Sequence, residues 1–197
     1  MHSLAFVPKL HQQVLFAALA LWILPEWIGS ILQRPEKGAT RHDRGSYAVI
    51  GLGLGAGILA ALACADRVRA TTISWQPAAV FWTGIALMVA GVAFRWYAIR
   101  ALGRYFTREV ATRAGQTVVE HGPYRLVRHP SYSGVLITVL GFGLALTNWL
   151  STLVVVACTF AGFSYRVHVE ERALREAIGE PYRHYMRRTR RFIPYIW

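Results

Sequence analysis

The stretch GVLITVLGFGLALTNWLSTLVVVACTFAGFSYRV, residues 134–167, is a 34-residue apolar run that Thr147 and Asn148 interrupt near its middle. A helix needs about 17–25 residues to cross the roughly 30 Å hydrocarbon core of a bilayer. The run is therefore too long for one crossing and slightly short for two. Asn148 suits a turn because its short polar side chain tolerates turn geometry. The stretch predicts a hairpin of two membrane helices with its tip at Asn148.

Three more apolar stretches come before this hairpin, at about residues 14–32, 47–65 and 77–99. Each is long enough for one crossing. The first is longer than the roughly 7–15-residue core of a signal peptide, and no small-x-small cleavage pattern follows it, so we expect it to be retained. Together with the hairpin, these stretches predict an all-α integral membrane protein with about five transmembrane helices.

The composition agrees with a membrane protein. Hydrophobic residues make up 54% of the chain and charged residues 16%, against about 45–50% and about 25% in soluble domains. This hydrophobicity excludes a disordered chain. The two cysteines both lie in apolar runs, which excludes a disulfide scaffold. The net charge of +12 would suit a soluble nucleic-acid-binding protein, but the hydrophobicity does not. We expect no nucleic-acid partner.

The basic residues are distributed unequally between the two sides that five crossings would create. One side carries three of them, Lys9, Arg67 and Arg69, whereas the other carries 17, in residues 33–46, in residues 100–133 and in the tail. The positive-inside rule places the richer side in the cytoplasm. We therefore expect a multi-pass membrane protein with a cytoplasmic C-terminus, in the inner cell membrane if the source is a prokaryote.

The chain divides into two parts by function. Residues 1–99 are mostly the three N-terminal spans. The remainder contains a loop at 100–133, the hairpin at 134–167, and a C-terminal helix and tail at 168–197. Polar residues that suit chemistry collect in the loop and after residue 165, both on the predicted cytoplasmic side. They predict one catalytic region at the membrane surface.

Residues 51–56, GLGLGA, match the dinucleotide-binding pattern G-x-G-x-x-A. That pattern works only as a strand-to-helix turn, and this one lies inside an apolar run. The pairs Gly51/Gly55 and Gly53/Gly57 instead have the spacing that lets two membrane helices approach closely. We interpret them as helix-packing residues.

Metal and triad chemistry find no support in the sequence. The seven histidines show neither zincin spacing nor partner cysteines. Aspartate occurs only at positions 43 and 66, and there is no nucleophile elbow. We expect no metal site and no Ser/His/Asp triad.

The segment EHGPYRLVRHPSYSG, residues 120–134, contains two prolines, two tyrosines, two histidines and two arginines just before the hairpin. Its Gly-Pro and His-Pro steps break helices and predict an ordered, irregular loop. Such backbone persists at membrane depth only when it is buried in protein or lines a cavity. The segment predicts a functional site, with a basic aromatic belt at the membrane interface as the alternative.

Two charged clusters follow the hairpin. Arg166 and Glu170 are four residues apart and share a helix face. They could present a cation and a carboxylate to a charged or zwitterionic ligand, or form an interfacial salt bridge worth about 0.3–0.5 kcal/mol. The run RRTRR at 187–191 favours contact with anionic lipid headgroups over nucleic acid.

At these residues the chain resembles the isoprenylcysteine carboxyl methyltransferase (ICMT) family of integral-membrane methyltransferases, which is related to phospholipid methyltransferases. The resemblance covers about residues 102–197. Its marks are LGRYF at 102–106, GPY at 122–124, RHPSYSG at 128–134, EE at 170–171, and GEPY at 179–182 with Tyr185 and Pro194.

The resemblance implies an S-adenosylmethionine-dependent methyltransferase that binds its cofactor, S-adenosyl-L-methionine, beside the membrane without a Rossmann domain. It implies a carboxylate acceptor, isoprenylcysteine-like, or another small lipophilic acceptor. Arg166 falls on a position that touches the substrate carboxylate, and Arg128 is a candidate for holding or polarising the substrate. The implied cofactor-binding residues are Gln116, Thr117, Val118, Val119, Tyr124, His129, Pro130, Ser131, Tyr132 and Glu170.

These residue types suit methyl transfer. A sulfonium methyl donor needs an in-line nucleophile and exclusion of water more than acid–base help. A carboxylate acceptor is already a nucleophile at neutral pH and requires no general base. The alternatives are a membrane NAD(P)H-dependent sterol-type reductase, a thiol or phospholipid methyltransferase of the same family, and a non-enzymatic membrane scaffold. The expected partners are the bilayer and a lipophilic or prenylated substrate, and the oligomeric state is open.

Overall fold

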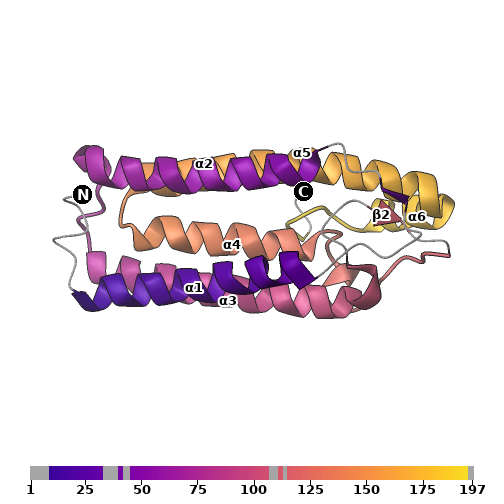
Figure 1. Cartoon of the computed structure of the whole chain (residues 1–197), viewed down its shortest axis with the longest axis horizontal. Helices are drawn as coiled ribbons and strands as arrows, with labels where there is room; N and C mark the ends of the chain where they lie inside the picture. Colours follow the sequence, from indigo (N-terminus) through magenta and orange to yellow (C-terminus); the bar gives the residue numbers. More distant parts are fainter. Residues whose placement is uncertain (1–8, 33–39, 42–44, 107–110, 113–114, 195–197) are drawn as a thin grey trace.

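The computed structural model describes residues 9–32, 40–41, 45–106, 111–112 and 115–194, and within this range the chain is a bundle of long helices (Figure 1). The short elements are the 3-10 helices η2 (Arg69–Thr71), η3 (Gly103–Tyr105) and η4 (Gly122–Arg125), and the antiparallel strands β1 (Thr40–Arg41) and β2 (Ala111–Thr112). The α-helices are α1 (Lys9–Leu32), α2 (Ser46–Arg67), α3 (Pro77–Leu102), α4 (Pro130–Ala145), α5 (Trp149–Ile178) and α6 (Glu180–Arg188).

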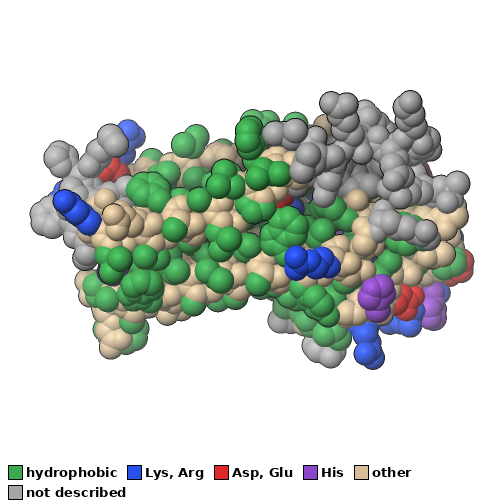
Figure 2. All heavy atoms as spheres, turned by 60° about the horizontal axis from the view of Figure 1, so that its bottom comes forward, with side chains coloured by type: hydrophobic (Ala, Val, Ile, Leu, Met, Phe, Trp, Pro, Cys, Tyr) green, Lys and Arg blue, Asp and Glu red, His purple; other side chains and the backbone are tan. Residues whose placement is uncertain are grey.

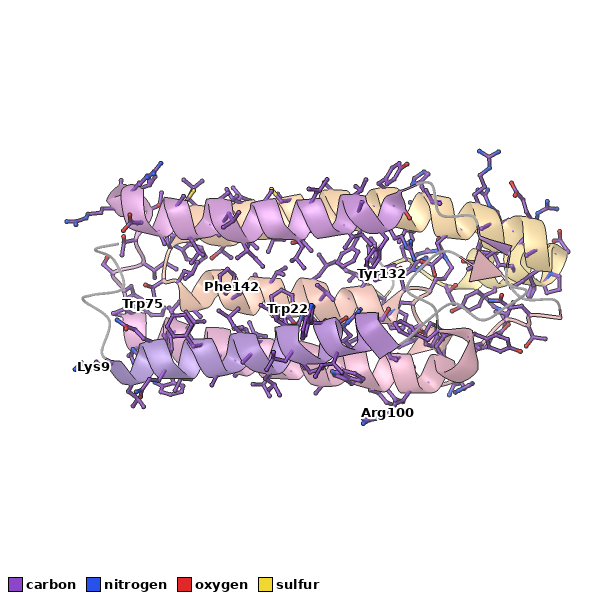
Figure 3. The ribbon with its side chains drawn as sticks, viewed as in Figure 1. Lys9, Trp22, Trp75, Arg100, Tyr132 and Phe142 are labelled. Carbon is purple, nitrogen blue, oxygen red and sulfur yellow. The ribbon has the colours of Figure 1, made fainter. Side chains whose placement is uncertain are left out.

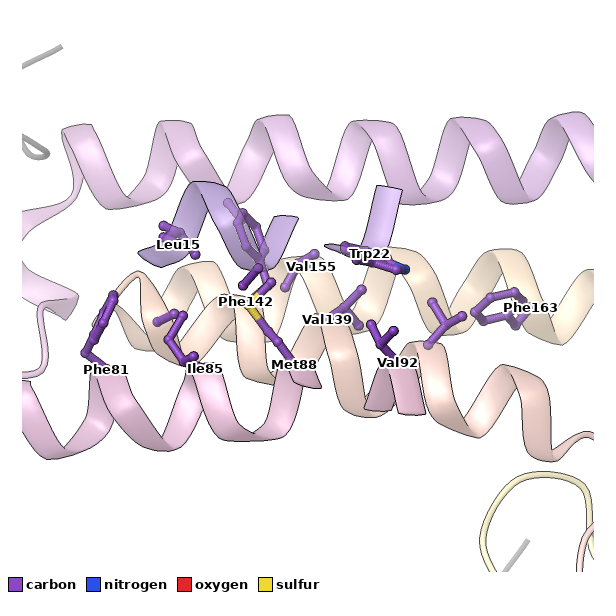
Figure 4. Packing of buried hydrophobic residues seen from close by; sticks show 14 of the residues in the cluster. Leu15, Trp22, Phe81, Ile85, Met88, Val92, Val139, Phe142, Val155 and Phe163 are labelled. Carbon is purple, nitrogen blue, oxygen red and sulfur yellow. The ribbon is translucent and has the colours of Figure 1, made fainter. Parts of the chain in front are cut away.

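Helix α4 lies at the centre of the bundle. Figure 1 shows α2 beside α5 on one side of α4, and α1 beside α3 on the other. Val139 and Phe142 of α4 are completely buried, and Met88 of α3 and Val155 of α5 pack in the same apolar cluster (Figure 4). Trp22 brings α1 into this cluster. The core therefore follows α4, and the outer helices enclose it.

The outer surface is that of a membrane protein. Hydrophobic side chains cover the middle of the face shown in Figure 2, whereas most charged side chains lie toward its ends and the visible histidines lie at one of them. Trp75 and Trp149 are strongly exposed near the α4–α5 turn, at the end of the bundle where Figure 3 shows Lys9 and Trp75. Tryptophan favours the membrane–water interface. These residues mark one edge of the apolar belt, and the prediction of an all-α membrane protein is confirmed.

The fifth predicted crossing is shorter than the others. Helices α1, α2, α3 and α5 are long and apolar enough to cross a membrane, whereas α4 has 16 residues. At about 1.5 Å per residue, α4 is about 24 Å long. Its first turn is fixed by Pro130, which cannot donate the hydrogen bond of a helix interior. Helix α5 takes the remaining length of the hairpin: its 30 residues extend past the start of α4 (Figure 1).

The hairpin turns at Asn148, the position predicted for its tip. The side chain of Asn148 caps α5 by accepting a hydrogen bond from the Ser151 amide at 2.9 Å. Its Nδ2 donates to the Val68 carbonyl at 3.1 Å, and the Ile73 amide donates to the Thr147 carbonyl at 2.8 Å. The turn is therefore capped locally and also tied to the α2–α3 connection.

Glycines set the closest helix contacts, and only part of this was predicted. A Cβ on Gly53 or Gly57 would meet Cys158 at 3.0 Å, so these two glycines do pack α2 against α5. Gly51 and Gly55 are different, since a Cβ there would have nothing within 4 Å among the described residues, and their assignment to packing was wrong. Periodicity alone does not say which face of α2 meets a neighbour.

The tightest approach is between α3 and α4. A Cβ on Gly91 would lie 2.6 Å from the Gly134 carbonyl oxygen and 2.6 Å from the Thr138 nitrogen. Because these are backbone atoms inside a helix, they cannot rotate away. We expect Gly91→Ala to destabilise the bundle by about 2 kcal/mol, which lowers the melting temperature of the detergent-solubilised protein by about 4 to 8 °C. Gly51→Ala is the matched control and should not lower it. An equal loss in both variants would contradict close α3–α4 packing.

A cap stands on the end of the bundle opposite the Asn148 turn. It consists of η3, η4, α6, the described segments between and after them, and the last turns of α5. Figure 1 shows α6 beyond the end of α4. Within the cap, a parallel bridge between Val127 and Arg190 joins the loop before α4 to the segment after α6.

Candidate active site

A cavity lies where the cap meets the ends of α4 and α5. Its empty space is about 830 Å³ when the open mouth is included, which is within the range of small-molecule sites. Residues from α3, η3, the loop before α4, α4 itself, α5 and α6 form its wall. They are Leu102, Tyr105, Phe106, Gln116, Thr117, Val118, Val119, Tyr124, Arg128, His129, Ser131, Tyr132, Glu170, Leu174, Ile178, Tyr182 and Tyr185.

The structure brings most of the predicted site residues to this cavity. Of the ten residues that the family resemblance implies for cofactor binding, nine line it. The exception is Pro130, which is buried as the first residue of α4. Arg128 lines the cavity, whereas Arg166 lies next to a lining residue, Tyr132, without lining the cavity itself.

The loop before α4 is held by the segment that follows α6. The Arg190 amide donates to the Leu126 carbonyl at 3.2 Å, and the Arg128 and His129 amides donate to the carbonyls of Arg190 and Arg191 at 2.7 and 3.0 Å. The irregular backbone predicted from the Gly-Pro and His-Pro steps is thus satisfied by main-chain pairing. Because of this pairing, Arg128 and His129 reach the cavity from a fixed position.

Glu170 is the acidic residue on the cavity wall. Its Oε2 accepts a hydrogen bond from the Tyr132 hydroxyl at 2.8 Å. The same oxygen lies 3.9 Å from His129 Nδ1 and 4.0 Å from Arg166 Nε. The Tyr132 ring stacks between His129 and Phe163, with centroid distances of 5.6 and 4.7 Å. A carboxylate is therefore held against an aromatic wall.

The neighbouring residue, Glu171, holds the cap together. Its side chain is only 3% exposed and accepts hydrogen bonds from Arg128 Nε at 2.8 Å and Arg191 Nη2 at 3.0 Å. His129 Nε2 lies 3.4 Å away, so the imidazole lies between the two glutamates. No role was predicted for Glu171 from the sequence. Its one signal was the Glu-Glu pair, which does not say which carboxylate faces the cavity.

Arg128, expected to hold or polarise the substrate, has its side chain bound to several groups of the protein itself. Besides its ion pair with Glu171, its Nη1 donates to the carbonyls of Met186 and Thr189 in and after α6. The guanidinium therefore links the loop, α5 and α6, and its charge is balanced inside the protein.

Arg166 lies deeper in the protein than Arg128, between the membrane helices α2, α4 and α5. It is 2% exposed, its Nη1 donates to Ser46 Oγ at 2.8 Å, and its Nε donates to the Tyr132 hydroxyl at 3.3 Å. Ser46 begins α2 and is itself fully buried. Arg166 thus joins α2, α4 and α5 directly behind the Tyr132–Glu170 pair.

No role was predicted for a second arginine, Arg95 of α3, whose side chain is 12% exposed. It forms a two-pronged ion pair with Glu26 of α1, one contact of which is 3.0 Å long. Its Nη1 also donates to the Ser131 carbonyl at 3.3 Å. Arg95 therefore fixes the first turn of α4 to the outer helices.

The tyrosines of the cap stay protonated. Burial raises the pKa of Tyr124, and the negative charge of Glu170 adds to the shift. Burial also raises the pKa of Tyr182 and of Tyr185. Their hydroxyls therefore keep their protons at neutral pH and do not act as bases, and that of Tyr185 donates to the Tyr124 carbonyl at 2.7 Å. Among the described residues, no group of three or more His, Cys, Asp or Glu side chains could hold a metal ion.

The fold and the cavity together define a class of protein. It is a helical integral membrane protein with a cavity, lined by a carboxylate and by tyrosines, at one end of its bundle. The model of the isoprenylcysteine carboxyl methyltransferase (ICMT) family matches residues 84–176, which include α4 and most of α5. Over these residues the chain is similar to this family, and the resemblance predicted from the sequence is confirmed.

Known relatives agree with this assignment. The probable protein-S-isoprenylcysteine O-methyltransferase of Oryza sativa subsp. indica is 34% identical over 119 residues, which are 59% of this chain and 62% of that protein. Protein-S-isoprenylcysteine O-methyltransferase B of Arabidopsis thaliana is 31% identical over 115 residues, 57% of this chain and 58% of that protein. The chain therefore matches less than two thirds of the length of these relatives.

The fold is also shared with a solved structure. The eukaryotic intramembrane Ras methyltransferase ICMT superposes with a TM-score of 0.64, covering 98% of this chain and 70% of that chain at 20% identity. The likeness extends over the N-terminal helices, which the sequence alone related to the family only in character.

Proposed function

We propose that the protein is an integral-membrane methyltransferase that uses S-adenosylmethionine. The observation that carries the proposal is the cavity, because one pocket at the end of the bundle collects nine of the ten residues that the family resemblance implies for the cofactor. The match to the family model and the similarity to relatives whose names specify O-methyl transfer support the same activity.

The cavity residues fit this cofactor chemically. The amino-acid end of S-adenosylmethionine carries an ammonium group, and Glu170 is a carboxylate on the wall. The Tyr124 and Tyr132 rings can flank the adenine or the sulfonium through stacking and cation–π contact. Gln116, Thr117 and the two following valines can offer main-chain groups. When bound, the cofactor supplies a methyl group on a positively charged sulfur.

The protein residues have positioning roles in this scheme. Because the tyrosines of the cap remain protonated, the arrangement suits an acceptor that arrives already ionised, such as a carboxylate. We assign Arg128 to holding the loop, since Glu171 balances its charge. Arg166 supports the Tyr132–Glu170 wall from the membrane side. The family resemblance, and not exposure to the cavity, makes it the proposed contact for the acceptor carboxylate.

The proposed acceptor is a lipophilic or prenylated carboxylate that reaches the cavity from the bilayer, because the site lies at the end of helices that span a membrane. The proposed orientation puts the cap in the cytoplasm. The cap and the loops on its side carry most of the 22 Lys and Arg residues, as the positive-inside rule requires for cytoplasmic segments.

Calorimetric titration of the detergent-solubilised protein tests the activity class. We expect saturable heat with S-adenosylhomocysteine, the demethylated product, and none with NADPH. Heat with NADPH alone would favour the sterol-type reductase, and heat with neither ligand would favour a scaffold. Radiolabelled methyl transfer from S-adenosylmethionine to a farnesylcysteine carboxylate, with the methyl ester as control, then distinguishes a carboxylate acceptor from a thiol or a phospholipid.

A further inference from the structure

A basic hollow lies on the outer surface of the cap. It is lined by Arg125, Leu126, Arg187, Arg188 and Arg190, and it measures about 480 Å³ when its open side is included. All five residues are exposed. We name it the arginine hollow. It is separate from the cavity proposed for the cofactor, with which it shares no lining residue.

The hollow and the cavity are the two faces of one piece of backbone. Arg125 and Leu126 are exposed, whereas Tyr124 and Val127 on either side of them are buried. Arg190, whose amide pairs with the Leu126 carbonyl, is likewise exposed between residues that face inward. Main-chain hydrogen bonds therefore fix Leu126 and Arg190 of the arginine hollow on the back of the loop that lines the cavity.

The hollow keeps an excess of positive charge. Arg187 forms an ion pair with Glu180 at 3.0 Å, and Arg188 forms one with Glu120. Both pairs are exposed, so they hold the charges only weakly. Two carboxylates face four guanidinium groups, and a phosphate would bring the negative charge that the hollow lacks.

Apolar side chains around the hollow indicate that this phosphate belongs to a lipid. Leu126 is 48% exposed within the hollow, and Ile193, three residues beyond Arg190, is 50% exposed. The ring of Phe192, the residue before Ile193, contacts Phe160 of α5 with a centroid distance of 5.9 Å. Phe160 lies on a helix that spans the membrane and is partly exposed itself. The hollow therefore stands where the apolar surface of α5 gives way to the cap, at the level of lipid headgroups.

We infer that the arginine hollow binds the headgroup phosphate of an anionic phospholipid of the surrounding bilayer, with Leu126 and Ile193 against the upper part of the acyl chains. Basic residues at a membrane surface attract anionic lipid, each with a contribution of several-fold in affinity. A lipid held there braces the pairing between residues 126–129 and 190–191. Anionic lipid therefore stabilises the cap.

The test measures the melting temperature of the whole protein in nanodiscs of phosphatidylcholine that contain an increasing fraction of phosphatidylglycerol. The variant is R125Q/R190Q, because both side chains are exposed and their main-chain bonds are retained. The control is R67Q/R69Q, which removes the same charge from exposed sites at the other end of the bundle. We expect phosphatidylglycerol to raise the melting temperature of the wild type and the control alike, and R125Q/R190Q to need a fraction about tenfold higher for the same rise.

Three outcomes overturn the inference. An equal response in R125Q/R190Q and the wild type would mean that the hollow is not the site. If R67Q/R69Q lost as much of the response to phosphatidylglycerol as R125Q/R190Q, the response would depend on net charge alone and not on the hollow. A rise of the same size with inorganic phosphate in pure phosphatidylcholine nanodiscs would make the hollow a site for a soluble anion. The melting temperature of R125Q/R190Q without anionic lipid verifies folding. Since no measurement involves a methyl donor, failure here leaves the proposed activity untouched.

Discussion

Glu171→Gln lowers the melting temperature of the detergent-solubilised protein by about 6 to 12 °C. The variant keeps the shape of the side chain but removes the negative charge that Arg128 and Arg191 share. Removing one partner of a buried ion pair leaves an uncompensated charge and costs about 3 kcal/mol. In a chain of this size, that loss corresponds to the stated change in melting temperature.

Glu176→Gln is the matched control for this prediction. Glu176 is on the same helix and pairs with Arg172 at 3.1 Å, but both side chains are more than half exposed. Exposed pairs of this kind contribute about 0.3–0.5 kcal/mol, so the melting temperature should change by about 1 °C. If Glu171→Gln changed it no more than Glu176→Gln does, Glu171 would not be the residue that holds the cap.

Features that depend on one segment of the chain could be predicted from the sequence. Apolar runs of sufficient length predict the membrane helices. Asn148, a polar residue that suits a turn, lies between two of these runs and predicts where the hairpin turns. The prolines at 123 and 130 predict an irregular loop, since each removes a helical hydrogen bond. The family resemblance then assigned residues in this loop to a site, and the fold brings them to one cavity.

Features that depend on which faces meet could not be predicted. Nothing in the sequence distinguishes Gly91 from the other glycines, and only the structure shows that α4 packs directly against it. The i,i+4 spacing of Arg166 and Glu170 identified the pair, but Ser46 and Tyr132, which bind Arg166, come from two other helices. The sequence makes Arg128 a candidate for holding the substrate, but it does not show that Glu171 balances the charge of Arg128.

Glu170→Gln is expected to weaken the binding of S-adenosylhomocysteine by about 10- to 100-fold, the usual value of a hydrogen bond to a charged group. The prediction rests on the position of the carboxylate. The contacts of Glu170 to Tyr132, His129 and Arg166 all use Oε2. Among the described residues this leaves Oε1 available on the cavity wall for the ligand's ammonium group.

A second ligand separates this role from a structural one. Methylthioadenosine has the adenosine and sulfur of the product but lacks the amino-acid end. If Glu170 binds the ammonium group, Glu170→Gln should leave the affinity for methylthioadenosine within about twofold of the wild-type value, because only the missing group interacts with the carboxylate. Glu176→Gln should change neither affinity. If Glu170→Gln weakened both ligands equally, the carboxylate would serve only to hold Tyr132 and the aromatic wall. The ammonium group would then have to bind elsewhere in the cavity, and the placement of the cofactor that follows from the family positions would be wrong for this protein.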